Sequence, residues 1–248
     1  MYNLGDETFV ERLIENPYRQ YFCVETFSQY KKPFDPSEFV HFRKRIGEVG
    51  AQKLLKLSLS LFDSKEVHEK EVLIDTTVQE KNITFPTDSK LHKKIIEGCR
   101  KISEKEGIAL RQSYKRTVKQ LMIEQRFREH PKKRKRANAA ARKLKTIAGR
   151  LVRDVERGLD DIDRLNCYDE QLWLYYRVLG QKRDDNNKIY SFHAPEVKCI
   201  SKGKEHKRYE FGNKSSFAIT KKSGIVVGAM AFEDNIFDGH TLEPQLVY

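Results

Sequence analysis

The chain has 248 residues and a formal net charge of +12, with 48 Lys/Arg against 36 Asp/Glu. At this length, 38% hydrophobic residues are enough to bury one large core or two small ones, and no run of about 18 apolar residues is present that would cross a membrane. The four cysteines, at positions 23, 99, 167 and 199, are scattered without a CxxC pair, which argues against a zinc site or a disulfide framework and predicts free thiols.

The N-terminus, MYNLGDETFVERL, lacks the charged-then-apolar pattern of a signal peptide, which predicts a cytoplasmic protein. The first 62 residues have the pattern of short helices. In DETFVERLIENP, which ends at Pro17, the apolar residues share one helical face: Phe9, Val10, Leu13 and Ile14. A later helix is predicted over AQKLLKLSLSLF, residues 51–62.

Between these two helices, DPSEFVHFRKRIG (35–47) carries the signals of a helix start and a helix end. Asp35 can cap it, Pro36 suits its first turn and Gly47 can end it. The spacing predicts one buried face, made of Phe39, Phe42 and Ile46. A buried aromatic face with a basic outer face suits a helix-turn-helix recognition helix, although an ordinary surface helix explains the pattern equally well. The candidate DNA contacts are His41, Arg43, Lys44 and Arg45.

Residues 66–88 are predicted to be extended. The apolar run Val72–Ile74 ends in a single carboxylate, Asp75. A polar turn around Lys81 and Asn82 then leads to a second extended run, 83–85. If the carboxylate of Asp75 takes part in catalysis, it needs other side chains beside it, and this segment does not contain them.

From Ser89 to about Gly180 the pattern is helical, with Gly107 and Pro131 as the clearest breaks. Apolar residues recur there at steps of three and four, which predicts a helix seam, either in a helical hairpin or in a short coiled coil. The seam residues are Leu144, Ile147 or Ala148, Leu151, Val155, Leu159 and Ile162.

The positive charge is concentrated on this helical region. Residues 126–157 contain thirteen Lys/Arg and three acids, a net charge of +10. Such a block indicates binding to a polyanion, most simply nucleic acid, while the alternative is a solvated helix face. The candidate phosphate contacts are Lys132, Lys133, Arg134, Lys135 and Arg136.

From Lys188 the chain is again predicted to be extended. KIYSFHAPEVKCI (188–200) reads as one extended segment, and 207–220 and 224–235 read as two strands joined by the turn Lys221–Gly224. Asp238 is predicted to cap a new helix. No motif indicates a nucleotide cofactor.

Seven blocks along the chain resemble, in order, blocks of bacterial insertion-sequence transposases of the DDE type. They cover nearly the whole sequence, and seven blocks in one order are far more specific than any single motif. The blocks are ENPYRQYFC (15–23), DPSEFVHFRKRIGE (35–48), IDTTVQEKNITFPTDSKL (74–91), LRQSY (110–114), IYSFHAPEVKCISKGK (189–204), YEFG (209–212) and DGHTL (238–242).

The resemblance implies an α+β protein. A helical, helix-turn-helix-like DNA-binding domain would span 1–62. A ribonuclease-H-like transposase domain would span 66–248 and would be interrupted by a basic helical insertion at about 89–185. In that fold the first strand carries the first of three catalytic acids, the place of Asp75, and the acids hold two Mg²⁺ ions, for which Mn²⁺ substitutes. The implied function is DNA transposition, a form of DNA recombination, with terminal inverted repeats of double-stranded DNA as partner and a homodimer expected by analogy.

The chain departs from the family pattern in its carboxylates. The blocks that carry the second and third acids are not found after residue 242, and family members carry more residues before NLGDETFVERL, so the sequence predicts a partial ribonuclease-H-like domain in a truncated chain. Asp238 is a candidate metal ligand, with a structural role at a helix start as the alternative. His193, Glu196 and Glu210 are expected to have packing or hydrogen-bonding roles.

Two functions therefore compete. The first is a transposase that cuts and joins DNA strands, and the second is a catalytically inactive DNA-binding fragment that interferes with a full-length transposase. The resemblance to an enzyme family does not decide between them, because the carboxylates beyond Asp75 are in doubt. A basic RNA- or ribosome-binding protein would explain the charge but neither Asp75 nor the ordered blocks.

Overall fold

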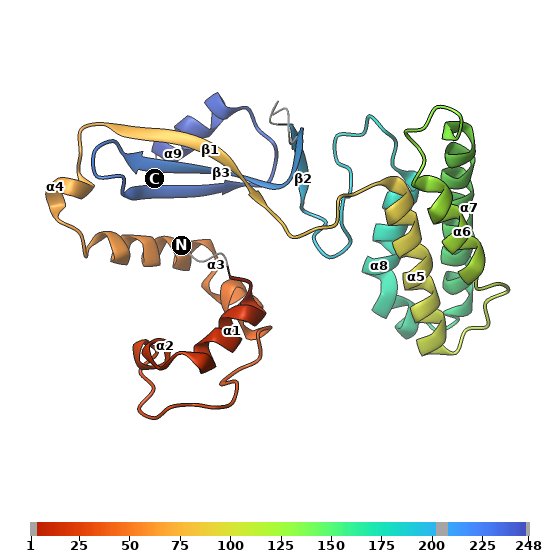
Figure 1. Ribbon diagram of the computed structural model, residues 1–248, viewed down its shortest axis with the longest axis horizontal. Helices are drawn as coiled ribbons and strands as arrows, with labels where there is room; N and C mark the ends of the chain where they lie inside the picture. Colours follow the sequence, from red (N-terminus) through yellow and green to blue (C-terminus); the bar gives the residue numbers. More distant parts are fainter. Residues whose placement is uncertain (1–3, 202–207, 247–248) are drawn as a thin grey trace. The chain divides into compact units, whose positions relative to one another are not determined.

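The computed structural model describes residues 4–201 and 208–246, which combine helices with one sheet and so agree with the predicted α+β class (Figure 1). The chain divides into two compact units. One holds the residues up to Leu73 together with Ile219–Gly228, and the other holds Ile74–Ala218 together with the residues from Ala229 onward. None of the helices in the described ranges is long and apolar enough to cross a membrane.

The N-terminal residues form four helices in sequence: α1 (Asp6–Glu15), α2 (Pro17–Phe22), α3 (Glu38–Leu59) and α4 (Ser64–Val67). Of the four apolar residues predicted on one face of α1, Val10 and Leu13 are buried, whereas Phe9 is 36% exposed. The side chain of Asn16 caps α2 by accepting a hydrogen bond from the Tyr18 N–H at 3.0 Å, and Pro17 occupies the first helical position, where its missing N–H costs nothing.

Helix α3 combines the two predicted helices 35–47 and 51–62. The carboxylate of Asp35 accepts a hydrogen bond from the Ser37 N–H at 2.9 Å, just before the helix begins. Gly47 has φ +57°, a left-handed conformation that breaks the helix where its end was predicted. The predicted buried face is wrong, because α3 has no buried residue and Phe42 is 49% exposed. Phe39 instead packs edge-on against the ring of Phe9, with centroids 5.5 Å apart.

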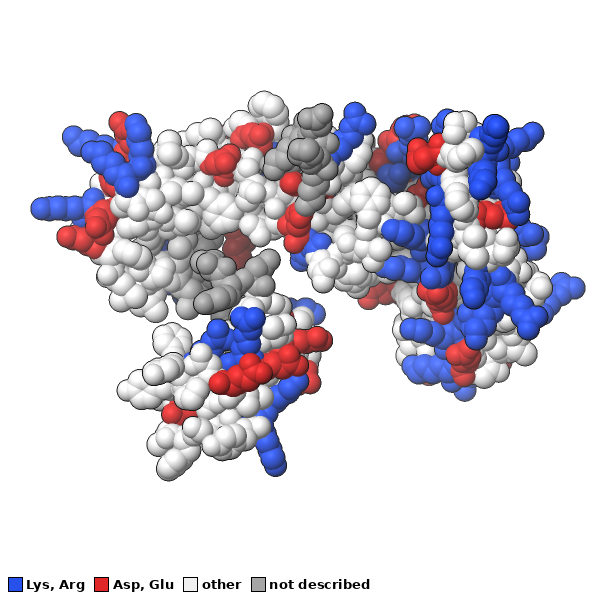
Figure 2. Space-filling view, viewed as in Figure 1, with Lys and Arg blue, Asp and Glu red and all other residues white. Residues whose placement is uncertain are grey.

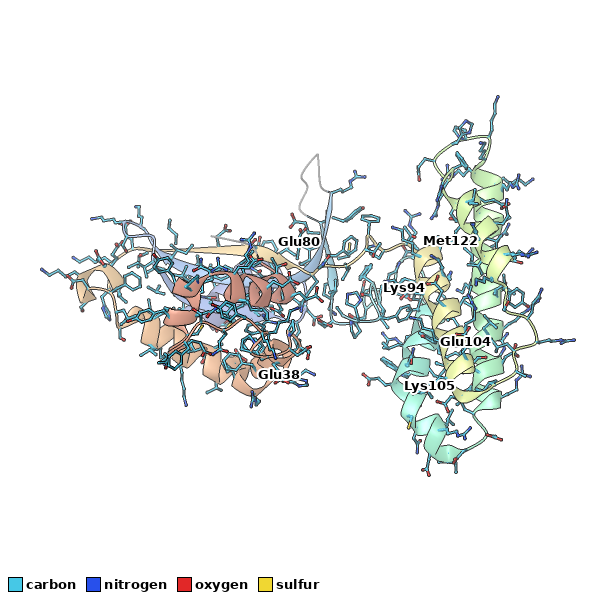
Figure 3. All side chains as sticks on the ribbon, turned by 60° about the horizontal axis from the view of Figure 1, so that its bottom comes forward. Glu38, Glu80, Lys94, Glu104, Lys105 and Met122 are labelled. Atoms are coloured by element: carbon cyan, nitrogen blue, oxygen red, sulfur yellow. The ribbon has the colours of Figure 1, made fainter. Side chains whose placement is uncertain are left out.

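Four strands form one sheet: β1 (Val72–Glu80), β2 (Lys198–Ser201), β3 (Tyr209–Thr220) and β4 (Val226–Phe232). The Lys81 N–H donates to the Phe211 carbonyl at 3.0 Å and the Lys221 N–H to the Glu71 carbonyl at 3.2 Å. The residue numbers of the partners on the β3 side decrease as those along β1 increase, so β1 and β3 are antiparallel. Figure 3 labels Glu80, where β1 ends.

Strand β3 is the centre of the sheet, because β1 borders it on one edge while β2 and β4 pair with it on the other. Strand β2 is antiparallel to the first residues of β3, with Lys198 opposite Gly212. Strand β4 pairs with β3, and a tight turn after Thr220 joins the two strands. The Thr220 N–H closes this turn by donating to the Ile225 carbonyl at 2.9 Å. The hairpin was predicted, and Gly224 at φ +68° supplies the left-handed residue of its turn.

Strand β1 lies at the edge of the sheet. Two expectations about extended chain are wrong. Residues 83–85 are not a strand, and of the segment 188–200 only the part from Lys198 enters the sheet. A strand needs a neighbouring strand for its backbone groups, and an apolar run in the sequence does not provide one.

The predicted helical region forms a bundle of α5 (Asp88–Glu106), α6 (Lys115–Gln125), α7 (Arg134–Gly158) and α8 (Ile162–Gly180) (Figure 1). Helix α7 packs against each of the other three. The predicted seam is confirmed by residues that are all at most 4% exposed: Leu144, Ile147, Ala148, Leu151, Val155 and Leu159. Ile162 is the exception at 75% exposed, because α7 ends at Gly158 and Ile162 begins the next helix.

Replacing Gly212 with alanine should weaken the sheet. A Cβ at this position would collide with the backbone carbonyl of Gln79 on β1, and a strand backbone cannot turn aside as a flexible side chain can. We expect Gly212→Ala to lower the free energy of unfolding by about 1–3 kcal/mol, the usual cost of overpacking. Gly180→Ala is the control, since nothing lies within 4 Å of its added Cβ. Equal urea-unfolding midpoints for the two variants would contradict the pairing of β1 with β3.

Acid should destabilise the bundle through His92 on α5, which is 5% exposed. Desolvation lowers the pKa of its imidazole from 6.5 to about 4, Asp88 opposes the change, and Lys145 adds to it. The unfolded chain therefore binds a proton at a higher pH than the folded one. The free energy of unfolding is fully retained above pH 6.5 and falls as the pH drops towards 4, by about 3 kcal/mol in total.

Urea unfolding between pH 4 and 7 measures this dependence. In His92→Leu, the loss of free energy of unfolding between pH 6.5 and 4 should be smaller than in the wild type by about 3 kcal/mol. The matched variant His130→Leu, at an exposed histidine, should behave as the wild type does. If the free energy of unfolding of His92→Leu still falls steeply in acid, groups other than His92 cause the fall.

Candidate carboxylate site and nucleic-acid interface

Asp75 lies in the middle of β1 rather than at the end of a strand, and its side chain is exposed. Lys81 and Glu71 both form backbone hydrogen bonds with the β3 side of the sheet. The N–H and C=O groups of odd-numbered residues of β1 therefore point towards β3, and those of even-numbered residues point away from it. The N–H of Thr76 therefore points to the open edge of the sheet, where the Asp75 carboxylate accepts it at 2.8 Å. This contact satisfies one backbone donor at an edge that no described strand covers.

Asp238 is brought to β1 by Thr76, not by Asp75. The Thr76 hydroxyl donates to the Asp238 carboxylate at 2.7 Å, and the ammonium of Lys214 on β3 forms an ion pair with the same carboxylate oxygen. The Lys214 side chain is only 8% exposed and also donates to the Ile236 carbonyl at 2.6 Å, whereas Asp238 is 67% exposed. This network ties the turn after β4 to the central strand.

The predicted role of Asp238 as a helix cap is wrong. The short 3₁₀ turn η1 (Asp238–Thr241) and α9 (Leu242–Leu246) do begin where a helix was predicted, but Phe237 is the cap residue. The carboxylate of Asp238 is turned towards β1 and β3 instead. Thr241 closes the turn by donating to the Asp238 carbonyl at 2.6 Å.

Asp75 and Asp238 do not share a site. Successive side chains of a strand point to opposite faces, so Thr76 and its partner Asp238 lie on one face while Asp75 projects from the other. Over residues 4–201 and 208–246, no group of three His, Cys, Asp or Glu side chains could hold a metal ion. The described residues therefore do not fit the two-Mg²⁺ centre that the resemblance implies, which needs several carboxylates on one side of the sheet.

The other acids and the histidine from the ordered blocks have local partners. Glu196 forms an ion pair with Lys81 at 3.3 Å, which links the segment before β2 to the end of β1. The Nδ1 of His193 lies 2.9 Å from the Ser191 hydroxyl. Glu210 is buried on β3, opposite Ile200. These contacts agree with the expected packing and hydrogen-bonding roles.

The helix-turn-helix candidates on α3 fall into two groups. Arg43 reaches back to α1, where its guanidinium makes two hydrogen bonds with the Asp6 carboxylate at 2.6 and 2.7 Å. This contact, chiefly through the hydrogen bond, lowers the pKa of Asp6. His41, Lys44 and Arg45 are exposed. Arg43 therefore holds α1 and α3 together, which leaves the other three as the accessible candidates.

The five basic candidates at 132–136 lie together, in the turn before α7 and in its first residues, and all are exposed. Two have partners within the bundle. Lys133 lies with its ammonium 4.0 Å from the centre of the Phe127 ring, and Arg136 pairs with Glu124 on α6 at 2.8 Å. Viewed as in Figure 1, Lys and Arg side chains gather over the surface of α5–α8 (Figure 2).

Sequence reasoning missed one feature of the bundle, a cleft with a volume of about 610 Å³. Its walls are the segment before α6 and one face of α7, and the lining residues are Arg111, Gln112, Tyr114, Arg150, Arg153, Asp154 and Arg157. The spacing of 150, 153 and 157 does predict one face of a helix. Nothing in the pattern, however, predicts that Arg111 from the block LRQSY would join it.

The chain is similar to a protein of Rhizobium meliloti whose name is uncharacterized protein ORF8 in the nfe locus. The two are 41% identical over 134 residues, which cover 52% of this chain and 65% of the relative, so the chain spans slightly less than two-thirds of that relative's length. No protein-family model matches the chain. No solved structure matches it.

Proposed function

We propose that the chain is a DNA-binding protein of the insertion-sequence transposase type, which contacts duplex DNA through the basic surface of its helical bundle. The observation that carries this proposal is the division of α7 into two faces. Its apolar residues are buried in the bundle, so its Lys and Arg side chains face outward together with Lys132 and Lys133. An exposed surface of this charge binds a polyanion by releasing the counterions that surround it.

The exposed residues of α3 form a second candidate DNA contact within the same proposal. His41, Lys44 and Arg45 project from a helix that the Arg43–Asp6 pair fastens to α1. A helix held in this way can present side chains to the major groove without a large loss of conformational freedom. The proposed partner is double-stranded DNA at the terminal repeats of an insertion sequence.

DNA transposition is the process to which we assign this binding, because of the ordered sequence blocks and the position of Asp75 on a strand beside β3. A partial ribonuclease-H-like domain is the proposed finer fold. For the strand-cutting step, the described carboxylates favour the inactive alternative, since Asp75 and Asp238 lie on opposite faces of the sheet.

Salt should weaken DNA binding steeply. If the basic surface neutralises about six phosphates, the logarithm of the association constant should fall with the logarithm of salt concentration at a slope near −5. Alanine at all five positions 132–136 should flatten that slope by about 0.9 for each phosphate contact removed. Fluorescence anisotropy with a labelled duplex between 50 and 300 mM salt measures both slopes.

A matched variant controls for the lower net charge. It replaces five basic residues elsewhere in the second unit with alanine: Lys101, Lys119, Lys182, Arg183 and Lys188. The control should keep most of the wild-type slope. If the wild type binds DNA weakly at low salt and neither variant changes its affinity, the basic block is only a solvated helix face. That result would contradict the proposal.

We expect the chain by itself neither to nick nor to join DNA. Two divalent ions a few ångström apart repel each other and need several carboxylates to hold them. Asp75 supplies one, and Asp238 is held on the other face by Thr76 and Lys214. The test is incubation with Mg²⁺ or Mn²⁺ and DNA that carries the element's ends, with Asp75→Asn as control. Metal-dependent 3′-end cleavage that Asp75→Asn abolishes would establish an active enzyme.

A further inference from the structure

The cleft at Arg111, Arg150 and Arg153 differs from the rest of the basic surface because its charges converge. Arg150, Arg153 and Arg157 lie at steps of three and four on α7, so they share one face of that helix. Arg111 comes from the segment before α6 and faces them across the cleft. Four guanidinium groups and a single carboxylate, Asp154, thus line one concave site.

Among the described residues, Arg157 is the only one of the four arginines that forms a salt bridge. The guanidinium of Arg157 pairs with Asp154 and also donates to the Arg153 carbonyl at 3.1 Å. Within the part of the chain that the structure describes, no carboxylate forms a salt bridge with Arg111, Arg150 or Arg153. Like charges that line one cleft repel each other, and an anion that enters it relieves the repulsion.

The wall opposite α7 is held in a defined position. Tyr114, the residue just before α6, has φ +54°, a left-handed conformation that is uncommon for a residue other than glycine. Its ring packs against the hydrophobic core of the bundle, which anchors the turn that carries Arg111 and Gln112. Leu110, the residue before Arg111, packs against the same core, so the segment that carries Arg111 is anchored on both sides.

We propose that this cleft is a second phosphate-binding site, which holds the sugar–phosphate backbone of one DNA strand. The proposal rests on the DNA binding proposed above and adds a site that lies apart in the sequence from residues 132–136. Arginine suits the ligand because its planar group can donate two hydrogen bonds to one phosphate. The face from Arg150 to Arg157 extends for about 10 Å along α7, since each helical residue rises about 1.5 Å, which is enough for two or three successive phosphates of a strand.

The first measurement compares the DNA affinity of two variants that lose the same charge. The cleft variant carries Arg111→Gln, Arg150→Gln and Arg153→Gln, and glutamine preserves the helix propensity of α7. The matched variant carries Lys101→Gln, Lys182→Gln and Arg183→Gln, at exposed positions outside the cleft. The cleft variant should bind duplex DNA about tenfold or more weakly at low salt, with a salt slope flatter by about 2.7, whereas the matched variant should stay close to the wild type.

The second measurement uses pyrophosphate as a small probe, in buffer without other multivalent anions. Pyrophosphate should raise the midpoint of thermal unfolding of the wild type and the matched variant, but not that of the cleft variant. Without pyrophosphate, the cleft variant should unfold at the same temperature as the wild type or a higher one, because it lacks the repulsion between arginines. That result also shows that the variant is folded.

The outcomes separate this inference from the proposed function. If the wild type binds DNA and the cleft variant keeps its affinity and slope, the cleft is not a DNA site, although the protein still binds DNA. A pyrophosphate effect confined to the cleft together with unchanged DNA affinity would make it a site for a free phosphate compound, which also overturns the inference. Loss of salt-dependent DNA binding in the wild type itself would remove both proposals.

Discussion

Burial of the apolar stripe of α7 is the constraint on which the bundle and its basic surface both depend. Leu144, Leu151, Val152 and Val155 are completely buried against the neighbouring helices. Each such side chain contributes about 1.5–3 kcal/mol relative to an exposed one. This stabilisation offsets the mutual repulsion of the Lys and Arg residues on the same helix. It also fixes the rotation of α7, so that the face with Arg150, Arg153 and Arg157 is exposed.

The sheet depends on β3 in a comparable way, since every other strand pairs with it. One side of β3 is taken by β1 and the other by β2 and β4, which leaves the outer edge of β1 without a strand among the described residues. The alternation of side chains along β1 then separates two neighbouring polar residues. Asp75 projects from one face, and Thr76 reaches Asp238 and Lys214 on the other.

Lys214 shows how a buried cation can be accommodated in such a sheet. A buried ammonium needs hydrogen-bond acceptors and an opposite charge, and Asp238 and the Ile236 carbonyl provide them. The cation thereby fixes the turn that follows β4. The same contacts occupy a carboxylate that the sequence made a candidate metal ligand, so the chemistry expected of Asp238 gives way to a structural role.

The sequence by itself determined the helical character of residues 89–180, the seam of α7 up to Leu159, the β3–β4 hairpin and the break at Gly47. These features depend on periodicities and turn residues within short segments. The tertiary structure alone decided that β1 is an edge strand, that Arg43 binds Asp6, that Asp75 and Asp238 lie on opposite faces, and that Arg111 meets the arginines of α7. Each of these results joins residues far apart in the chain, and the pattern of a single segment carries no information about which distant segment will pack against it.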